Sequence, residues 1–136
     1  MRRLEGRAIR SISFYYLSRQ IVTLCPLTIE QTMIHMIATI ELQPGRRDDF
    51  LAELEAIVPL VRAEQGCVEY TPTIDAETSL PTLVPRRHDV VVIVERWESL
   101  AGLEAHLVAP HMLAYRPKVR EFVANVALQV LEPVGG

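Results

Sequence analysis

The chain has 136 residues, of which 49% are apolar and 23% are charged, and its net charge is −3 at pH 7. This length suits one domain with its own core, and the composition is that of a globular protein rather than a disordered one. Residues 1–32 contain five Arg and two Glu, a charge of +3, which leaves −6 for the rest of the chain. An acidic body disfavours nucleic acid and anionic membranes as partners, so we expect a small molecule instead.

Residues 1–32 show no strand or helix period, and we expect an N-terminal extension outside the core. Translation from a downstream methionine, an amphipathic targeting peptide and an accessory arm are the alternatives for this segment. Cys25 and Cys67 form neither a CxxC pair nor a disulfide framework, which fits the reducing cytoplasm. No run reaches the roughly 18 apolar residues that a membrane span needs. We therefore expect one cytoplasmic domain over residues 33–136.

The first half of this domain carries two clear periods. Residues 36–42 alternate between apolar and polar side chains, which predicts a strand. Pro44-Gly45 ends it, and an apolar stripe over residues 50–61 then predicts a helix packed on the sheet. Pro59 lies inside this stripe and removes one backbone donor, so we expect a bend or a break just before it. Gly66 is the expected stop.

Two more strands are expected on either side of a long loop. Residues 67–74 predict a strand that is weakened by Pro72. Residues 75–88 have no period and predict a loop of the kind that often serves as a lid or a partner contact. Val90–Trp97 is an almost continuous β-branched run, which predicts a central strand covered on both faces.

The last third predicts two helical pieces and a strand. A short helix is expected after Ser99 and ends at Pro110, a second helical piece covers about 111–124, and residues 126–130 form the last strand. The order β-α-β-β-α-β predicts an α+β, ferredoxin-like fold, an antiparallel sheet with helices on one face. Those helices leave the other face of the central strand without cover. We therefore expect a homodimer in which two such sheets pack face to face.

Four short stretches on these elements resemble the antibiotic biosynthesis monooxygenase (ABM) family. They are PGRRDDF at 44–50, EQGCVEY at 64–70, ERWES at 95–99 and AHLVAPHM at 105–112. The match covers about residues 36–132, and the stretches stand in the right order at the right distances. The resemblance implies a dimeric α/β barrel that oxidises a quinol, an anthrone or a related polycyclic phenol with dioxygen, without metal or flavin. A non-catalytic small-molecule-binding or stress-response module on the same dimeric scaffold is the alternative.

The same family is also similar to haem-degrading monooxygenases. Those enzymes depend on a histidine about nineteen residues after the tryptophan of the central strand, and here Arg116 stands at that distance from Trp97. His106 stands where those enzymes often carry a second tryptophan. Haem degradation is therefore a minor alternative, and no cofactor is expected.

Oxygenation without a cofactor requires the substrate to supply the electrons, which a deprotonated hydroquinone does more readily than the neutral form. His106, whose usual pKa is about 6.5, is the predicted base. Arg96 or the indole N–H of Trp97 is predicted to stabilise the phenolate. The structural alternatives are a His106 that is hydrogen-bonded to a loop carbonyl and a Trp97 that only packs in the core.

Four further side chains are candidates for binding the substrate: Tyr70, Glu95, His111 and Tyr115. Glu95 shares a strand face with Trp97, and a salt bridge is the alternative role for it. His111 stands near a helix start, where capping or solvation is the alternative. The two tyrosines can donate a phenolic hydrogen bond or simply pack. No metal is predicted, because residues i and i+5 of one helix, such as His106 and His111, lie on different faces and Pro110 intervenes.

Overall fold

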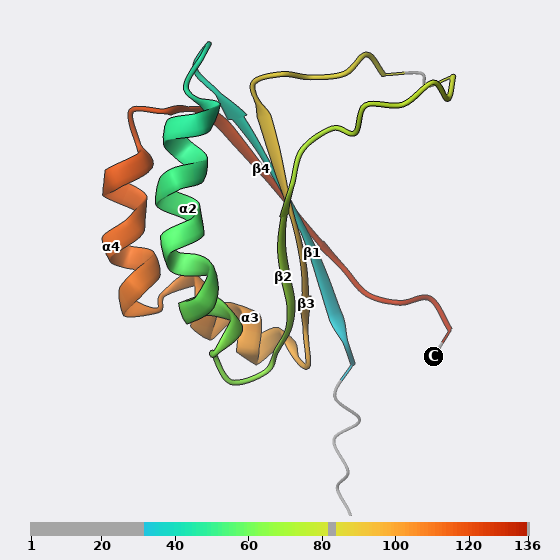
Figure 1. Ribbon diagram of the computed structural model, residues 1–136. Coiled ribbons are helices and arrows are strands. Elements are labelled where there is room, and N and C mark those ends of the chain that lie inside the picture. The colour runs from blue at the N-terminus through green and yellow to red at the C-terminus, as the bar shows by residue number, and fades with distance from the viewer. Residues whose placement is uncertain (1–31, 82–83, 136) are drawn as a thin grey trace, which may run out of the picture. The chain divides into compact units, whose positions relative to one another are not determined.

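The computed structural model describes residues 32–81 and 84–135, which form one antiparallel sheet and its helices. In chain order the elements are β1 (Ile34–Leu42), α2 (Arg47–Arg62), β2 (Cys67–Thr73), β3 (Val90–Trp97), α3 (Leu100–Leu107), α4 (Pro110–Val119) and β4 (Val123–Leu131). The strand order is β2-β3-β1-β4, and the helices lie on one side of the sheet (Figure 1). This is the ferredoxin-like α+β fold that the element order predicts. The N-terminal extension expected over residues 1–32 lies almost entirely outside the described residues.

The two inner strands, β1 and β3, separate a buried face from a partly exposed one. Met36 and Ala38 pair with Glu95 and Ile93, and all four side chains are buried toward the helices. The intervening residues of both strands are only half-buried, because no helix of the described chain covers that face. The prediction that β3 is central is confirmed, since it pairs with both β1 and β2.

Helix α2 supplies the stripe that closes the buried face. Its buried residues are Phe50, Leu54, Ile57 and Val61. Full burial of side chains of this size stabilises a fold by about 1.5–3 kcal/mol each, relative to exposure. The break expected before Pro59 is wrong, because α2 continues to Arg62. Pro59 lies in the last turn, where its ring costs one hydrogen bond, and its carbonyl still accepts from Ala63 N at 3.2 Å.

Helices α3 and α4 are two separate helices with a change of direction between them. Ser99 caps α3 as expected, because its Oγ accepts from Gly102 N at 3.1 Å. Pro110 then occupies the start of α4, where a missing N–H costs nothing. The helix expected to reach residue 124 ends instead at Val119, and β4 begins at Val123. The residues after Val119 pair with the end of β1 and its neighbour instead of continuing the helix: Val123 pairs with Leu42, and Gln43 N donates to Phe122 O at 2.8 Å.

Strand β4 is an edge strand with an apolar strip on its helix-side face. Val126, Leu128 and Val130 pair with Ile40, Ala38 and Met36, so they share the buried face of β1. Their side chains are nevertheless 49%, 51% and 51% exposed, because the helices of the described chain do not extend over this edge. The single chain therefore leaves apolar surface uncovered at β4.

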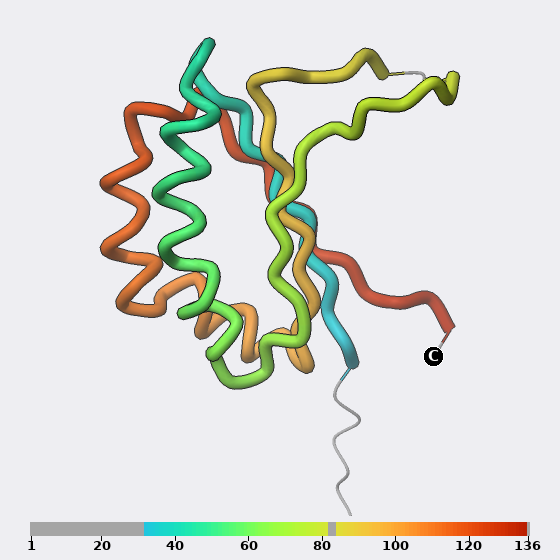
Figure 2. The backbone as a smooth tube through the Cα atoms, in the orientation of Figure 1, coloured from blue at the N-terminus to red at the C-terminus, as the bar shows by residue number. Residues whose placement is uncertain are grey.

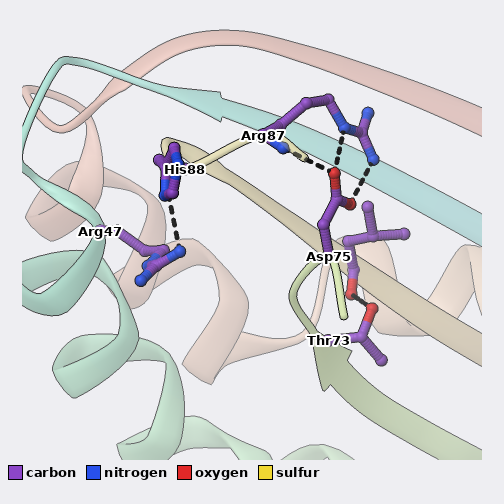
Figure 3. A network of polar contacts seen from close by, with 6 residues as sticks. Arg47, Thr73, Asp75, Arg87 and His88 are labelled. Atoms are coloured by element: carbon purple, nitrogen blue, oxygen red, sulfur yellow. Dashed lines mark hydrogen bonds and ion pairs between the residues drawn. The ribbon is translucent and has the colours of Figure 1, made fainter. Parts of the chain in front are cut away.

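The long connection between β2 and β3 leaves the sheet and returns to it, as Figure 2 shows. Asp75 accepts three hydrogen bonds from Arg87, one from the backbone N at 2.9 Å and two from the guanidinium at 2.9 and 2.8 Å (Figure 3). Arg47 on α2 donates to His88 O at 2.8 Å. These hydrogen bonds join the two ends of the loop to each other and to α2.

None of the helices in the described ranges is long and apolar enough to cross a membrane.

Candidate active site

A cavity of about 160 Å³ lies between the buried face of the sheet and the helices, and its wall is mostly apolar. Engineered cavities of roughly this volume hold one benzene molecule, so the space suits one aromatic ring. Three β4 side chains, Val123, Val126 and Leu128, line it as well. The polar and ionisable side chains that line it are Tyr70, Glu95, His106, Tyr115 and Arg116.

His106 is the buried imidazole of this cavity, with 1% of its surface exposed. It lies on α3 among aromatic rings, with centroids 4.9 Å from Trp97 and 5.7 Å from Tyr70. Its Nδ1 is 2.9 Å from Glu64 Oε1. Burial lowers the pKa of His106 below its usual value, although the neighbouring Glu64 acts in the opposite direction. At neutral pH the imidazole is therefore a neutral group that can accept a proton.

Glu64 joins two histidines, and it is the site residue that sequence reasoning missed. The same Oε1 lies 2.5 Å from His111 Nε2 on α4, whose side chain is 21% exposed. A carboxylate only accepts, so both imidazole nitrogens that face it carry hydrogen. Glu64 opens the EQGCVEY stretch, which was the one available signal for it.

The expectation that His106 and His111 lie too far apart to act together is wrong, because the helix that begins at Pro110 turns His111 back toward Glu64. One ligand atom from each of Glu64, His106 and His111 lies within 4.8 Å of the others, so this group is the candidate metal site of the described residues. The shared Oε1, however, is already hydrogen-bonded to both nitrogens. A cation would take the place of the protons in both bonds, as metal binding to such ligands does, and the absence of a metal stays our prediction.

Glu95 and Trp97 form a second buried pair. The indole Nε1 donates to Glu95 Oε2 at 2.9 Å, and the two residues are 1% and 0% exposed. Glu95 thus has an indole partner where a salt bridge was the alternative, and the Trp97 N–H is occupied rather than free for a phenolate. Burial raises the pKa of Glu95 to about 7.

The two tyrosines both line the cavity, Tyr70 from β2 and Tyr115 from α4. The hydroxyl of Tyr115 is buried and has no hydrogen-bond partner among the described residues. A buried unsatisfied hydroxyl is costly, which marks this atom as a candidate contact for a bound molecule. Burial raises the pKa of both phenols, so they act as neutral donors.

Arg96 does not join this group. It alternates with Glu95 and Trp97 along β3, so it lies on the other face of the sheet, where its Nε is 3.1 Å from Glu69. The structure therefore gives no support to Arg96 as a phenolate stabiliser. Arg116 lines the cavity instead, with Nη2 donating to Leu107 O at 2.6 Å.

Comparison with known proteins places this geometry in a family. The model of the antibiotic biosynthesis monooxygenase family matches residues 33–118. A protein of Escherichia coli K12 named "Probable quinol monooxygenase YgiN" is 40% identical over 105 residues, which is 74% of this chain and 98% of that protein.

Solved structures agree with the sequence relatives. Rv0793 of Mycobacterium tuberculosis superposes with a TM-score of 0.64 at 30% identity and covers 77% of this chain and 98% of its own. PA3566 of Pseudomonas aeruginosa gives a TM-score of 0.65 at 28% identity over 78% of this chain and 98% of its own. The chain belongs to the antibiotic biosynthesis monooxygenase family.

Proposed function

We propose that this protein is a monooxygenase that oxidises a quinol or a polycyclic phenol with dioxygen and needs no cofactor. The family and the relative named as a quinol monooxygenase support the reaction class. The observation that carries the proposal is a mostly apolar cavity with a buried imidazole in its wall, His106, which Glu64 holds by Nδ1. A filled core would have favoured a non-catalytic module on the same scaffold.

The electrons of this reaction all come from the substrate. One oxygen atom of dioxygen is bonded to a ring carbon and the other leaves as water. A hydroquinone is thereby converted to a hydroxyquinone. A hydroquinone loses four electrons in this conversion, which is the number that dioxygen needs, so no external reductant is required. The protein's part is to remove the phenolic proton, because the anion gives up electrons to dioxygen far more readily than the neutral phenol.

His106 is the proposed base, and Glu64 sets its tautomer. With the hydrogen on Nδ1 held by Glu64, Nε2 of the neutral ring is left to accept the proton. The carboxylate also stabilises the imidazolium that forms, as the acidic member of a catalytic triad does. A cavity without water strengthens both interactions.

Tyr115 is proposed to orient the substrate, because it lines the cavity and its buried hydroxyl has no partner among the described residues. Tyr70, Glu95 and Arg116 are the other polar side chains of the wall, and His111 acts through Glu64 rather than on the substrate. We also propose a homodimer, supported by the half-buried sheet face and the exposed strip on β4. The cytoplasm remains the expected compartment.

Oxygen uptake with labelled dioxygen tests the function. The purified protein is incubated with a panel of hydroquinones, dihydroxynaphthalenes and anthrones under ¹⁸O₂, and one label is expected in the product and one in water. His106→Gln should reduce the rate on the order of 10²–10⁴-fold, the reach of a general base. His88→Gln is the matched control, because His88 is exposed in the loop between β2 and β3 and its hydrogen bond to Arg47 is made by its backbone carbonyl. Absence of uptake with every compound, or equal rates of the two variants, would refute the proposal.

A further inference from the structure

We propose that Glu95 is a second proton-transfer group of the active site. It donates a proton to the peroxide that forms on the substrate ring, and it then removes the hydrogen of the ring carbon that carries this peroxide. The inference rests on the proposed function and extends it to a step that His106 does not perform. Three observations carry it: the position of Glu95 in the cavity wall, its burial at 1% exposure, and a single neutral hydrogen-bond donor to it among the described residues.

The position of Glu95 is fixed by the sheet. It lies on the inner strand β3, directly between Met36 of β1 and Tyr70 of β2, so it cannot turn away to solvent. The Trp97 indole donates one hydrogen bond to it, and the described chain shows no ion pair on this carboxyl. One hydrogen bond from a neutral donor does not offset the hydration free energy that an ionised carboxyl loses on burial.

The charged and titratable groups around Glu95 do not supply the missing compensation. Glu64 lies near enough to oppose its negative charge, while the Cys67 thiol and the Tyr70 and Tyr115 phenols are neutral. His106 is neutral at pH 7, and its Nδ1 is hydrogen-bonded to Glu64. The Arg116 guanidinium donates to the Leu107 carbonyl. The pKa of Glu95 is accordingly raised to about 7, mainly by burial. Near neutral pH both its acid and its base forms are populated, as a group that donates and accepts in one cycle requires.

The reaction has a place for such a group. His106 takes the phenolic proton, and the anion combines with dioxygen to form a C–O bond at a ring carbon that still carries its hydrogen. The Glu95 carboxylic acid protonates the terminal oxygen of this peroxide. The resulting carboxylate then removes the hydrogen of the same carbon, whose electrons form C=O as the O–O bond breaks. Hydroxide leaves with the proton of the His106 imidazolium, so water forms and both side chains return to their starting states.

The decisive variant is Glu95→Gln, which still accepts from Trp97 but cannot carry a proton. With 1,4-dihydroxynaphthalene as the probe, we expect kcat to fall about 10²-fold or more and KM to change less than about twofold. The pH–rate profile of the wild type should have a limb near pH 7 that reports the ionisation of Glu95, and the profile of Glu95→Gln should lack it. Glu69→Gln is the matched control, since Glu69 lies on the neighbouring strand and pairs with Arg96 on the other face. Its rate and profile should stay at the wild-type values.

An infrared titration gives a readout that does not depend on activity. The wild type should show a protonated-carboxyl band that fades around pH 7, and Glu95→Gln should lack it. An ionised carboxyl across pH 5–8, or a Glu95→Gln variant with wild-type kcat, would overturn the inference and leave the proposed function standing. A wild type without oxygen uptake would refute both. Should Glu95→Gln fail to fold, Trp97→Phe removes the indole donor and should move the same limb to higher pH. An unmoved limb would overturn the inference.

Discussion

Replacing Glu95 by glutamine should stabilise the protein at alkaline pH and change it little at acidic pH. The reason is that an ionised carboxyl is unfavourable at this buried position, whereas an amide is neutral at every pH and still accepts from the Trp97 indole. The native protein avoids the unfavourable state by keeping the proton, and it loses that option as the pH rises.

The magnitude follows from the pKa of Glu95 in the two states. In the unfolded chain it is near 4.5, and in the folded protein burial raises it to about 7. Between these values the folded state binds the proton that the unfolded state has released, so the free energy of unfolding falls as the pH rises and levels off above pH 7. At about 1.36 kcal/mol for each pH unit, the loss between pH 5 and pH 8 is about 2.5 kcal/mol.

Thermal melts of the wild type and Glu95→Gln at pH 5 and pH 8 measure this difference. The gap in melting temperature should widen by roughly 10 °C toward pH 8 for a domain of this size. His106 contributes in the opposite direction, because its lowered pKa makes stability fall as the pH falls, but this contribution is common to both proteins and cancels. Glu69→Gln should follow the wild type. A gap that is constant with pH would show that Glu95 ionises normally, and the reasoning from burial would be refuted.

The remaining predictions concern the histidine pair, the assembly and the N-terminal segment. Glu64→Gln should lower kcat and move the limb that belongs to His106 to lower pH, because Glu64 raises the pKa of that imidazole; an unmoved limb would contradict this. Dialysed protein should retain no stoichiometric zinc or iron, and one equivalent of metal that His111→Ala loses would contradict this. Light scattering of the wild type should give twice the chain mass. Val94→Arg on the half-buried face should give a monomer with unchanged circular dichroism. A wild type that is monomeric would contradict the proposed homodimer. Removing residues 1–32 should shift the melting temperature by only a few degrees, and a loss of about ten degrees or more would show that the segment packs on the domain.

The fold could be predicted from the sequence because its elements carry their own periods. The alternation of β1, the stripe of α2 and the β-branched run of β3 each identify an element and the face that it buries. Two boundaries failed for physical reasons. Pro59 does not end α2, because Ile57 and Val61 on either side of it are buried in the core and hold the last turn in place. The end of α4 is set by a hydrogen bond from Gln43 N to Phe122 O, which joins residues distant in sequence.

Only some members of the candidate site, and few of their contacts, could be predicted from the sequence. His106, Tyr70, Tyr115 and Glu95 line the cavity, but the bond from His106 to Glu64 joins residues 42 positions apart, and no local pattern indicates it. The placement of Arg96 is different, because the two-residue period of a strand already puts it on the face opposite its neighbours.

Strand β4 has a consequence for how the substrate range of this protein could be altered. Leu128 forms part of the cavity wall and is still 51% exposed, so it borders the substrate space without belonging to the densely packed interior. Truncating a fully buried leucine to alanine typically costs 2–5 kcal/mol, and within a single chain, where Leu128 keeps half of its surface exposed, the cost should be roughly half as much. In the proposed homodimer the partner's contacts with this strip add to that cost. Val126 and Leu128 are therefore the positions at which the size of the accepted ring system and the dimer contact can be altered together.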